Sequence, residues 1–234
     1  GRSCDNTSVT GTRQGGGRTA TATTNGTMGM ALAEALGPRA GGALRVKQAA
    51  LVAFGVALLT AAAQVKVAVP PSPVAINLGT FAVLTIGAAY GPRLGLTTIL
   101  AYMGIGALGF DVFQSSTAEL RGIDYMTGTT GGYLLGYVLA VALMGALARR
   151  GWDRSVGWTA LAMLAGNVVL YVPGLAWLGY LIAQGMFQPE TYGTVWAQTL
   201  AWGLTPFLIG DAMKLALAAL VLPAAWALVG RARR

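Results

Sequence analysis

Histidine is absent from this chain of 234 residues, and cysteine occurs only once, at Cys4. Without histidine there is no imidazole acid, base or metal ligand, and no Ser–His–Asp triad. A single cysteine also excludes internal disulfides and zinc–cysteine clusters. The G-x-x-x-x-G-K-[ST] loop that cradles nucleotide phosphates is missing as well. We therefore expect no metal and no cofactor, and few enzyme chemistries remain available.

Charged residues are scarce, whereas apolar residues are plentiful. Charged residues make up 10% of the chain and hydrophobic residues 55%, with a mean hydropathy of +0.60. Soluble domains carry about 25% charged residues. Apolar stretches recur at roughly the 20-residue length that crosses a bilayer as a helix. The composition predicts an all-α membrane protein with several spans.

The composition divides the chain into two regions. Residues 1–44 are rich in Gly, Thr, Ser and Ala. They show no apolar periodicity and lack the 7–15-residue apolar core of a signal peptide. We predict a disordered tail for residues 1–44 and one transmembrane substrate-binding domain for residues 45–234.

Six transmembrane helices are predicted in the second region, each judged against the length needed to cross a bilayer. The second and third are short and share the break Gly91-Pro92-Arg93, which favours a tight helical hairpin. The predicted spans are residues 48–69, 78–91, 92–110, 130–148, 156–184 and 203–229.

The distribution of charge agrees with six spans. Most basic residues then fall on one side of the membrane: Arg39, Arg45, Lys47, Arg93, Arg149, Arg150, Arg154, Arg231, Arg233 and Arg234. The other side receives Lys66, Arg121, Asp111, Glu119, Asp124 and Glu190. By the positive-inside rule, both termini are expected in the cytoplasm. Topology thus accounts for most of the net charge of +8, and we expect no nucleic-acid partner.

Two opposite charges interrupt the last span. Asp211 and Lys214 are three residues apart in IGDAMKLALAAL, so they project from nearly the same helix face. A charge at membrane depth is costly and usually faces a partner or a polar cavity. Two compatible roles are open: an internal ion pair that holds the bundle together, or the polar wall of a ligand site. In the second role Lys214 meets an anionic group, and Asp211 accepts hydrogen bonds from N–H donors.

Further polar features fall on the outer side. The segment GTTGGYLLG (128–136) opens the fourth span, and a glycine-rich helix start exposes N–H groups to a ligand. Its small residues alternatively permit close helix packing. VPPSPVAINLGTF (69–81) forms a stiff, proline-rich loop suited to a lid. Asn167 in the fifth span serves either an inter-helix hydrogen bond or a ligand. The candidate ligand-binding residues are Asp211, Lys214, Tyr133, Gly131, Gly132, Thr130 and Asn167, and the candidate lid residues are Pro73, Val74 and Thr80.

The order of these motifs resembles the BioY family, the biotin-specific S-components of energy-coupling-factor (ECF) transporters. The resemblance covers residue 48 to the C-terminus and includes an intact G-D-x-x-K signature at Gly210, Asp211 and Lys214. The family's G-P-T-G-G-Y matches at Gly128, Thr130, Gly131, Gly132 and Tyr133, with Thr129 in place of proline. Its P-V-P-x-T-L-Q-T-F matches at Pro73, Val74, Leu78, Thr80 and Phe81 and departs at Ala75, Asn77 and Gly79. Its G-L-P-V-F becomes GFDVF, with Asp111 replacing another proline.

The resemblance implies a subunit of the cytoplasmic membrane that captures biotin from outside. Asp211 and Lys214 would help to hold the polar end of the vitamin, and the loop at residues 70–80 would close over it. In the family, such a subunit docks onto a transmembrane coupling protein driven by two ABC-type ATPases. Ala49, Ala53, Ala57 and Ala61 form a small-residue stripe along the first span and resemble the family's docking motif. Packing within the chain is the alternative role for this stripe.

Two other functions are compatible with the residues. One is an S-component or small permease for another water-soluble vitamin or anion, because the departures in the loops fall in the segments expected to face the ligand. The other is an intramembrane enzyme with Asp211 as a general base. Without histidine, Lys214 and Tyr133 are the few candidates for its second catalytic group.

Overall fold

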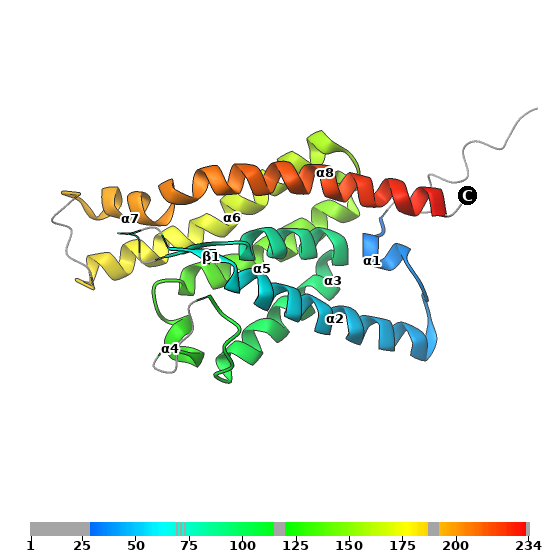
Figure 1. Cartoon of the computed structure of the whole chain (residues 1–234), viewed down its shortest axis with the longest axis horizontal. Coiled ribbons are helices and arrows are strands. Elements are labelled where there is room, and N and C mark those ends of the chain that lie inside the picture. The colour runs from blue at the N-terminus through cyan, green and yellow to red at the C-terminus, as the bar shows by residue number, and fades with distance from the viewer. Residues whose placement is uncertain are drawn as a thin grey trace, which may run out of the picture.

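The computed structural model of the chain describes residues 29–68, 70, 72, 74–114, 120–186 and 192–232. Long helices lie side by side along the molecule and are joined by short segments at its two ends (Figure 1). The helices are α1 (Leu32–Ala35), α2 (Gly41–Gln64), α3 (Gly79–Ala107), α4 (Gly122–Met126), α5 (Gly131–Arg149), α6 (Val156–Ala183), α7 (Val195–Gly203) and α8 (Leu208–Ala232), with 3-10 turns η1 (Trp152–Arg154) and η2 (Thr205–Phe207). Strands β1 (Lys66–Val67) and β2 (Ile76–Asn77) pair antiparallel.

Four helical stretches in the described part of the chain are long and apolar enough to cross a membrane. They are Gly41–Gln64, Gly131–Arg149, Val156–Ala183 and Val195–Arg231. The last of these runs through α7, η2 and α8. The chain is therefore a mostly helical, multi-pass membrane protein, and its small β1–β2 hairpin is an element that the sequence analysis did not predict.

Helix α3 is broken at Gly91 and folds back on itself. Gly91 has a φ of 77°, a left-handed conformation that glycine adopts without steric cost, and Pro92 cannot continue the hydrogen-bond ladder. A Cβ on Gly95 would lie only 3.5 Å from the Cα of Gly87. In a straight helix eight residues span about 12 Å, so the two halves of α3 lie against each other. The predicted helical hairpin is confirmed.

Glycines allow α5 to pack closely against its neighbours. A Cβ on Gly132 would lie 2.3 Å from the carbonyl oxygen of Pro173, and one on Gly136 would lie 2.4 Å from that of Leu170. Both oxygens belong to α6, so the two backbones are nearly in contact. Among the described elements, α3–α5 and α5–α6 are the most extensively packed pairs. Helix α5 is thus the centre of the bundle.

The prediction of a disordered tail is wrong for residues 29–44. Ala31, Ala33 and Ala35 around α1 are buried, and Ala35 packs with Trp226 of α8. Glu34 forms a 2.6 Å ion pair with Arg149 at the end of α5. These contacts give the segment a place in the fold, and α2 already begins at Gly41. The remaining residues of the predicted tail, 1–28, lie outside the described part.

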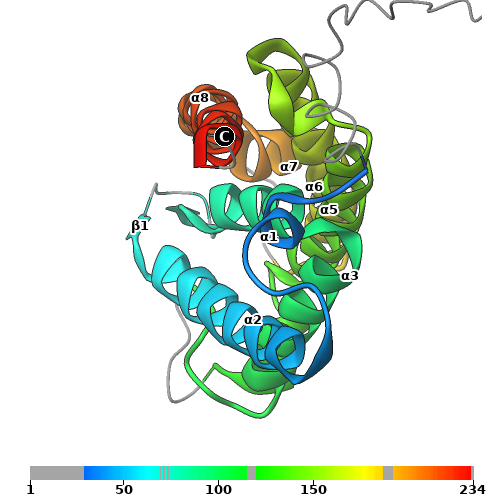
Figure 2. The same ribbon diagram turned by 90° about the vertical axis from the view of Figure 1, so that its right-hand side faces the viewer.

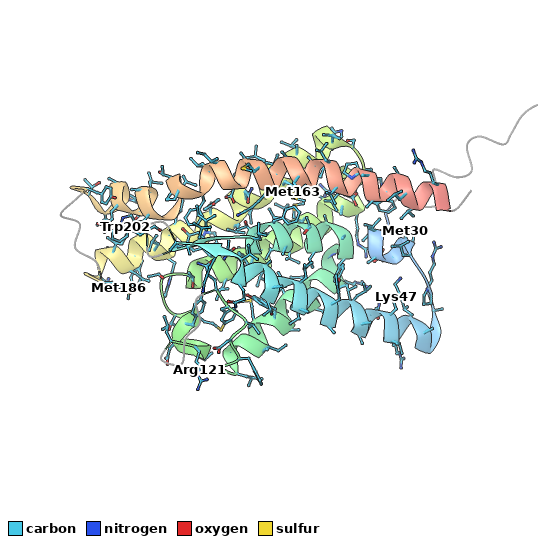
Figure 3. All side chains as sticks on the ribbon, in the orientation of Figure 1. Met30, Lys47, Arg121, Met163, Met186 and Trp202 are labelled. Carbon is cyan, nitrogen blue, oxygen red and sulfur yellow. The ribbon has the colours of Figure 1, made fainter. Side chains whose placement is uncertain are left out.

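Basic residues gather at one end of the molecule, because Arg45 and Lys47 lie in the first turns of α2, Arg93 follows the turn of α3, Arg149 and Arg150 end α5, and Arg231 lies in the last turn of α8. The start of α2 and the last turns of α8 lie at this end, which we call the basic end (Figure 1). The turn of α3 and the end of α5 lie there too, because Gly91 and Arg149 both contact the segment around α1. Lys47 lies at this end, whereas Arg121, Met186 and Trp202 lie at the opposite one, which we call the loop end (Figure 3). The β1–β2 hairpin, α4 and α7 are at the loop end. The segments predicted to form the ligand site therefore share one end of the bundle.

Candidate ligand-binding site

A small cavity of about 50 Å³ lies inside the bundle, toward the loop end. Helices α3, α5, α6 and α8 and the segment around β2 contribute its walls. Its lining combines a few polar groups with many aromatic rings, the usual composition of a small-molecule site. The lining residues are Ala63, Val74, Ala75, Asn77, Thr80, Tyr102, Phe113, Gln114, Tyr125, Thr130, Tyr133, Leu134, Tyr137, Leu170, Tyr171, Phe207 and Lys214.

The charged pair of α8 lies at this cavity. The Nζ of Lys214 is 3.1 Å from Asp211 Oδ1 and donates to Thr80 Oγ1 at 3.0 Å. The hydroxyl of Tyr171 donates to the other oxygen of Asp211. Asp211 is 7% exposed and lies behind the wall, while its partners Lys214 and Tyr171 line the cavity. Two donors satisfy the buried carboxylate, and the ammonium faces the cavity.

An amide pair forms a second polar part of the wall. Asn77 Nδ2 donates to Gln114 Oε1, and Gln114 Nε2 donates to the carbonyl oxygen of Ala75 at 3.0 Å. Asn77 Oδ1 also accepts from the N–H of Gly79 at 2.7 Å, at the start of α3. These bonds connect β2 and the residue before it to the segment that follows α3. These hydrogen bonds set the position from which the two amides face the cavity.

Aromatic side chains form the rest of the wall. Phe113 stacks on Tyr125 with ring centroids 5.0 Å apart and meets Tyr102 edge-on at 5.3 Å. Tyr133 meets Tyr171 edge-on at 6.1 Å. Burial raises the pKa of Tyr125, which lies in α4 outside the spanning helices, so its hydroxyl stays protonated. Such rings provide a large apolar contact area for a ring-bearing ligand.

The structure brings together most of the residues singled out in the sequence. Lys214, Tyr133, Thr130, Val74 and Thr80 line the cavity, with Asp211 directly behind Lys214. Pro73 lies outside the described residues.

Three of the predicted ligand residues do not line the cavity. A Cβ on Gly131 would lie 2.2 Å from the carbonyl oxygen of Met126, and Gly132 is similarly confined by α6. These two glycines therefore have the packing role that was the alternative at this segment. Asn167 is buried deeper in α6, beside Gly166, and its Oδ1 accepts no hydrogen bond within the described structure.

Several residues of the site were not predicted. The sequence analysis named Asn77 only as a departure from a family motif and did not consider Tyr171 or Gln114. Tyr171 lies four residues after Asn167, one helical turn further toward the cavity, a spacing that could have identified it. Asn77 and Gln114 meet across 37 residues, and no local pattern predicts such a contact.

The alanine stripe of α2 lies on the surface. Ala49, Ala53, Ala57 and Ala61 are all exposed, together with Phe54, which is 62% exposed. Packing within the chain therefore does not account for the stripe. This face of α2 is available to lipid or to another protein.

These features define a class of protein: a multi-pass helical membrane protein with a buried ion pair at an aromatic cavity. Within the described residues, no group of three acidic or thiol side chains could hold a metal ion. Binding of an organic ligand is the chemistry that this arrangement supports.

Comparison with known proteins identifies the family. The model of the BioY family matches residues 33–231, and the chain belongs to that family. A probable biotin transporter BioY of Pyrococcus horikoshii is 32% identical over 178 residues, which cover 76% of this chain and 95% of the relative. The biotin transporter BioY of Thermotoga maritima is 29% identical over 155 residues, covering 66% and 82%.

The fold also has a counterpart among solved structures. The crystal structure of the S-component for biotin from an ECF-type ABC transporter superposes with a TM-score of 0.61 at 20% identity. The match covers 83% of this chain and 94% of that one. The bundle is therefore the S-component fold.

Proposed function

We propose that this chain takes up biotin across the cytoplasmic membrane, as the substrate-binding S-component of an ECF transporter. One observation carries the proposal: in a chain of the BioY family, a buried Asp211–Lys214 pair lies at an aromatic cavity near one end of the bundle. The chain has no histidine that could act as a catalytic partner of Asp211. A ligand-binding role therefore explains the buried ion pair better than a catalytic role.

The chemistry of biotin fits the cavity wall. Its ureido group has two N–H donors, which suit the carboxylate of Asp211 and the side-chain oxygens of Asn77 and Gln114. Its carboxylate suits the ammonium of Lys214, and its fused rings suit the aromatic wall. When no ligand is bound, Lys214 is occupied by Asp211 and Thr80. Ligand binding thus exchanges these internal bonds for bonds to the vitamin.

Entry of the vitamin requires the walls to separate. The cavity measures about 50 Å³, whereas small-molecule pockets usually enclose about 300–1,000 Å³. The segment 74–80, which contains β2, is the wall best suited to move, because it reaches the cavity through Val74, Asn77 and Thr80 from a hairpin of two residues per strand. We propose that it is the lid, which opens to admit biotin and closes over it.

The number of spans and the position of the basic residues predict how the chain lies in the membrane. The two halves of α3 count as separate short spans, which gives six in all, with both termini and the basic end in the cytoplasm. Biotin then enters from outside at the loop end. The exposed Ala49, Ala53, Ala57 and Ala61 form the docking face for a transmembrane coupling protein, which two ABC-type ATPases drive.

A ligand panel tests the proposed substrate. The full chain, purified in detergent, is titrated calorimetrically with biotin and, separately, with other water-soluble vitamins that carry a carboxylate. We expect saturable binding of biotin at micromolar concentration or below, and none of the others at tenfold higher concentration. If another vitamin binds more tightly than biotin, that vitamin is the substrate, and the assignment of the site still stands.

A further inference from the structure

A second, larger hollow lies between α2 and α3, away from the proposed biotin site. It is a groove of about 1100 Å³ whose walls are mostly apolar, with Leu51, Val52 and Val56 on α2 and Leu94 and Ile105 on α3. Alanines of α2 on its wall keep it open. Viewed along the bundle, α2 lies at one edge, and the first half of α3 separates it from α8 (Figure 2). The groove therefore belongs to the lipid-facing periphery of the protein.

One mouth of this groove is strongly basic. Arg39, Lys47, Arg93 and Arg149 all line it, and Glu34 is the one acidic residue among the described residues of its lining. Glu34 is already paired with Arg149 at 2.6 Å. The mouth therefore carries an excess of three positive charges, which repel one another unless an anion lies among them.

The length of the groove matches one leaflet of a bilayer. Its lining on α2 runs from Leu44 to Ala57, about 20 Å at the rise of a helix, of which about 15 Å lies beyond Lys47. On α3 it runs from Arg93 to Ile105, about 18 Å. The hydrocarbon core of a bilayer is about 30 Å thick, so one leaflet is about 15 Å. A cationic mouth followed by an apolar groove of this length fits the headgroup and acyl chain of a single lipid.

We propose that this groove binds an anionic phospholipid of the leaflet at the basic end. The phosphate lies among Arg39, Lys47 and Arg93, and an acyl chain runs between α2 and α3. Basic pockets between transmembrane helices on the cytoplasmic side bind anionic headgroups for this electrostatic reason. Ala49, Ala53 and Ala57 also line the groove, so the bound lipid covers part of the proposed docking face and leaves it when a coupling protein docks.

Native mass spectrometry of the purified full chain tests the proposal. The chain is titrated with phosphatidylglycerol and with phosphatidylcholine carrying the same acyl chains. The variant Lys47→Gln/Arg93→Gln removes two charges from the mouth. Its matched control, Arg150→Gln/Arg231→Gln, removes two charges from the same end outside the groove. Ala101→Trp fills the groove from α3 without changing its charge.

We expect the wild type to prefer phosphatidylglycerol. The groove double variant should weaken phosphatidylglycerol binding by about fivefold for each charge removed, and the control double variant by less than twofold. Ala101→Trp should weaken the binding of both lipids. Thermal unfolding of each variant verifies that it is folded. Equal affinity for the two lipids, or equal losses in the two double variants, would overturn the proposal. None of these measurements depends on biotin binding.

Discussion

Lys214 connects parts of the chain that are far apart in sequence. It donates to Thr80 at the start of α3, 134 residues away, and pairs with Asp211 on its own helix. The side chains of Lys214 and Asp211 are only 12% and 9% exposed. Removing a partner from a buried charge is costly in free energy. The strength of the site therefore depends on the neutral partners Thr80 and Tyr171 as well as on the two charged residues.

The hydroxyl of Thr80 provides a prediction at this scale. In Thr80→Val the side-chain shape is kept, but Lys214 loses an acceptor in the wall that also touches the ligand. We expect biotin affinity to fall by about tenfold, because a hydrogen bond to a charged group contributes at least about 1.5 kcal/mol. Thr85→Val is the matched control on the same helix, because within the described part of the chain the Thr85 hydroxyl donates to carbonyl oxygens of its own turn alone. Equal losses in both variants would exclude a role for Thr80 in the site.

The sequence predicted the charged residues of the site better than the neutral ones. Asp211 and Lys214 are identifiable because charges at membrane depth are rare and their spacing places them on one face. Tyr171 and Gln114 are ordinary residues in their own segments and gain their role from contacts across the bundle. Gly131 and Gly132 were candidate ligand residues because a glycine-rich helix start can serve either ligand binding or close helix packing. In the structure, the backbone of Met126 and of α6 lies so close to these two glycines that they serve packing.

At the scale of the elements, the turn at Gly91 sets the shape of α3. In Gly91→Ala the new Cβ would meet Ala31 at 3.0 Å, and alanine at a φ of 77° and a ψ of 177° costs about 1–3 kcal/mol. We expect the temperature of thermal unfolding in detergent to fall by several degrees. Gly104→Ala, later in α3, has no neighbour within 4 Å of its Cβ and should leave that temperature unchanged or raise it slightly. A neutral Gly91→Ala would contradict the strained-turn account.

Asp153 in η1 provides a test by pH. It is 2% exposed and accepts a hydrogen bond from Trp226 of α8. Burial raises the pKa of Asp153, and the Trp226 bond and the charge of Arg154 oppose this only in part. Because the folded-state pKa is raised, this group's contribution to stability is full below the unfolded pKa of about 3.9 and is lost as pH rises through the folded value.

We therefore expect Asp153→Asn to gain stability relative to the wild type as pH rises from about 4 to about 7. Thermal unfolding across this pH range measures the difference between the two proteins. Asp124→Asn, at an exposed position of α4, should follow the wild type throughout. Parallel curves for Asp153→Asn and the wild type would show that Asp153 does not titrate differently in the folded state.

Elements were predictable where one local signal was strong. Gly91-Pro92 predicted the hairpin of α3, because positive φ and a missing N–H are properties of the residues themselves. The order around α1 was missed, since a segment rich in alanine and glycine gains its stability from Trp226 and Arg149, far along the chain. The β1–β2 pair is only two residues long on each side and has no recognisable pattern.

At the scale of the whole molecule, the segregation of charge predicts the orientation in the membrane. Cys4 is the only cysteine, so Cys4→Ser provides a background for single-cysteine labelling. In intact cells, a membrane-impermeant thiol reagent should label Arg121→Cys at the loop end and not Arg231→Cys at the end of α8. After the cells are opened, both should react. Labelling of Arg231→Cys in intact cells would place the basic end outside and contradict the proposed topology.

Biotin binding by site variants tests the central claim most directly. The wild type, Asp211→Asn, Lys214→Ala and the exposed control Lys66→Ala are titrated with biotin under identical conditions. Loss of one partner from a buried, hydrogen-bonded charge pair is worth about 2–5 kcal/mol, so affinity should fall at least about 30-fold in both site variants and remain unchanged in the control. Wild-type affinity in both Asp211→Asn and Lys214→Ala would show that the buried pair does not hold the vitamin.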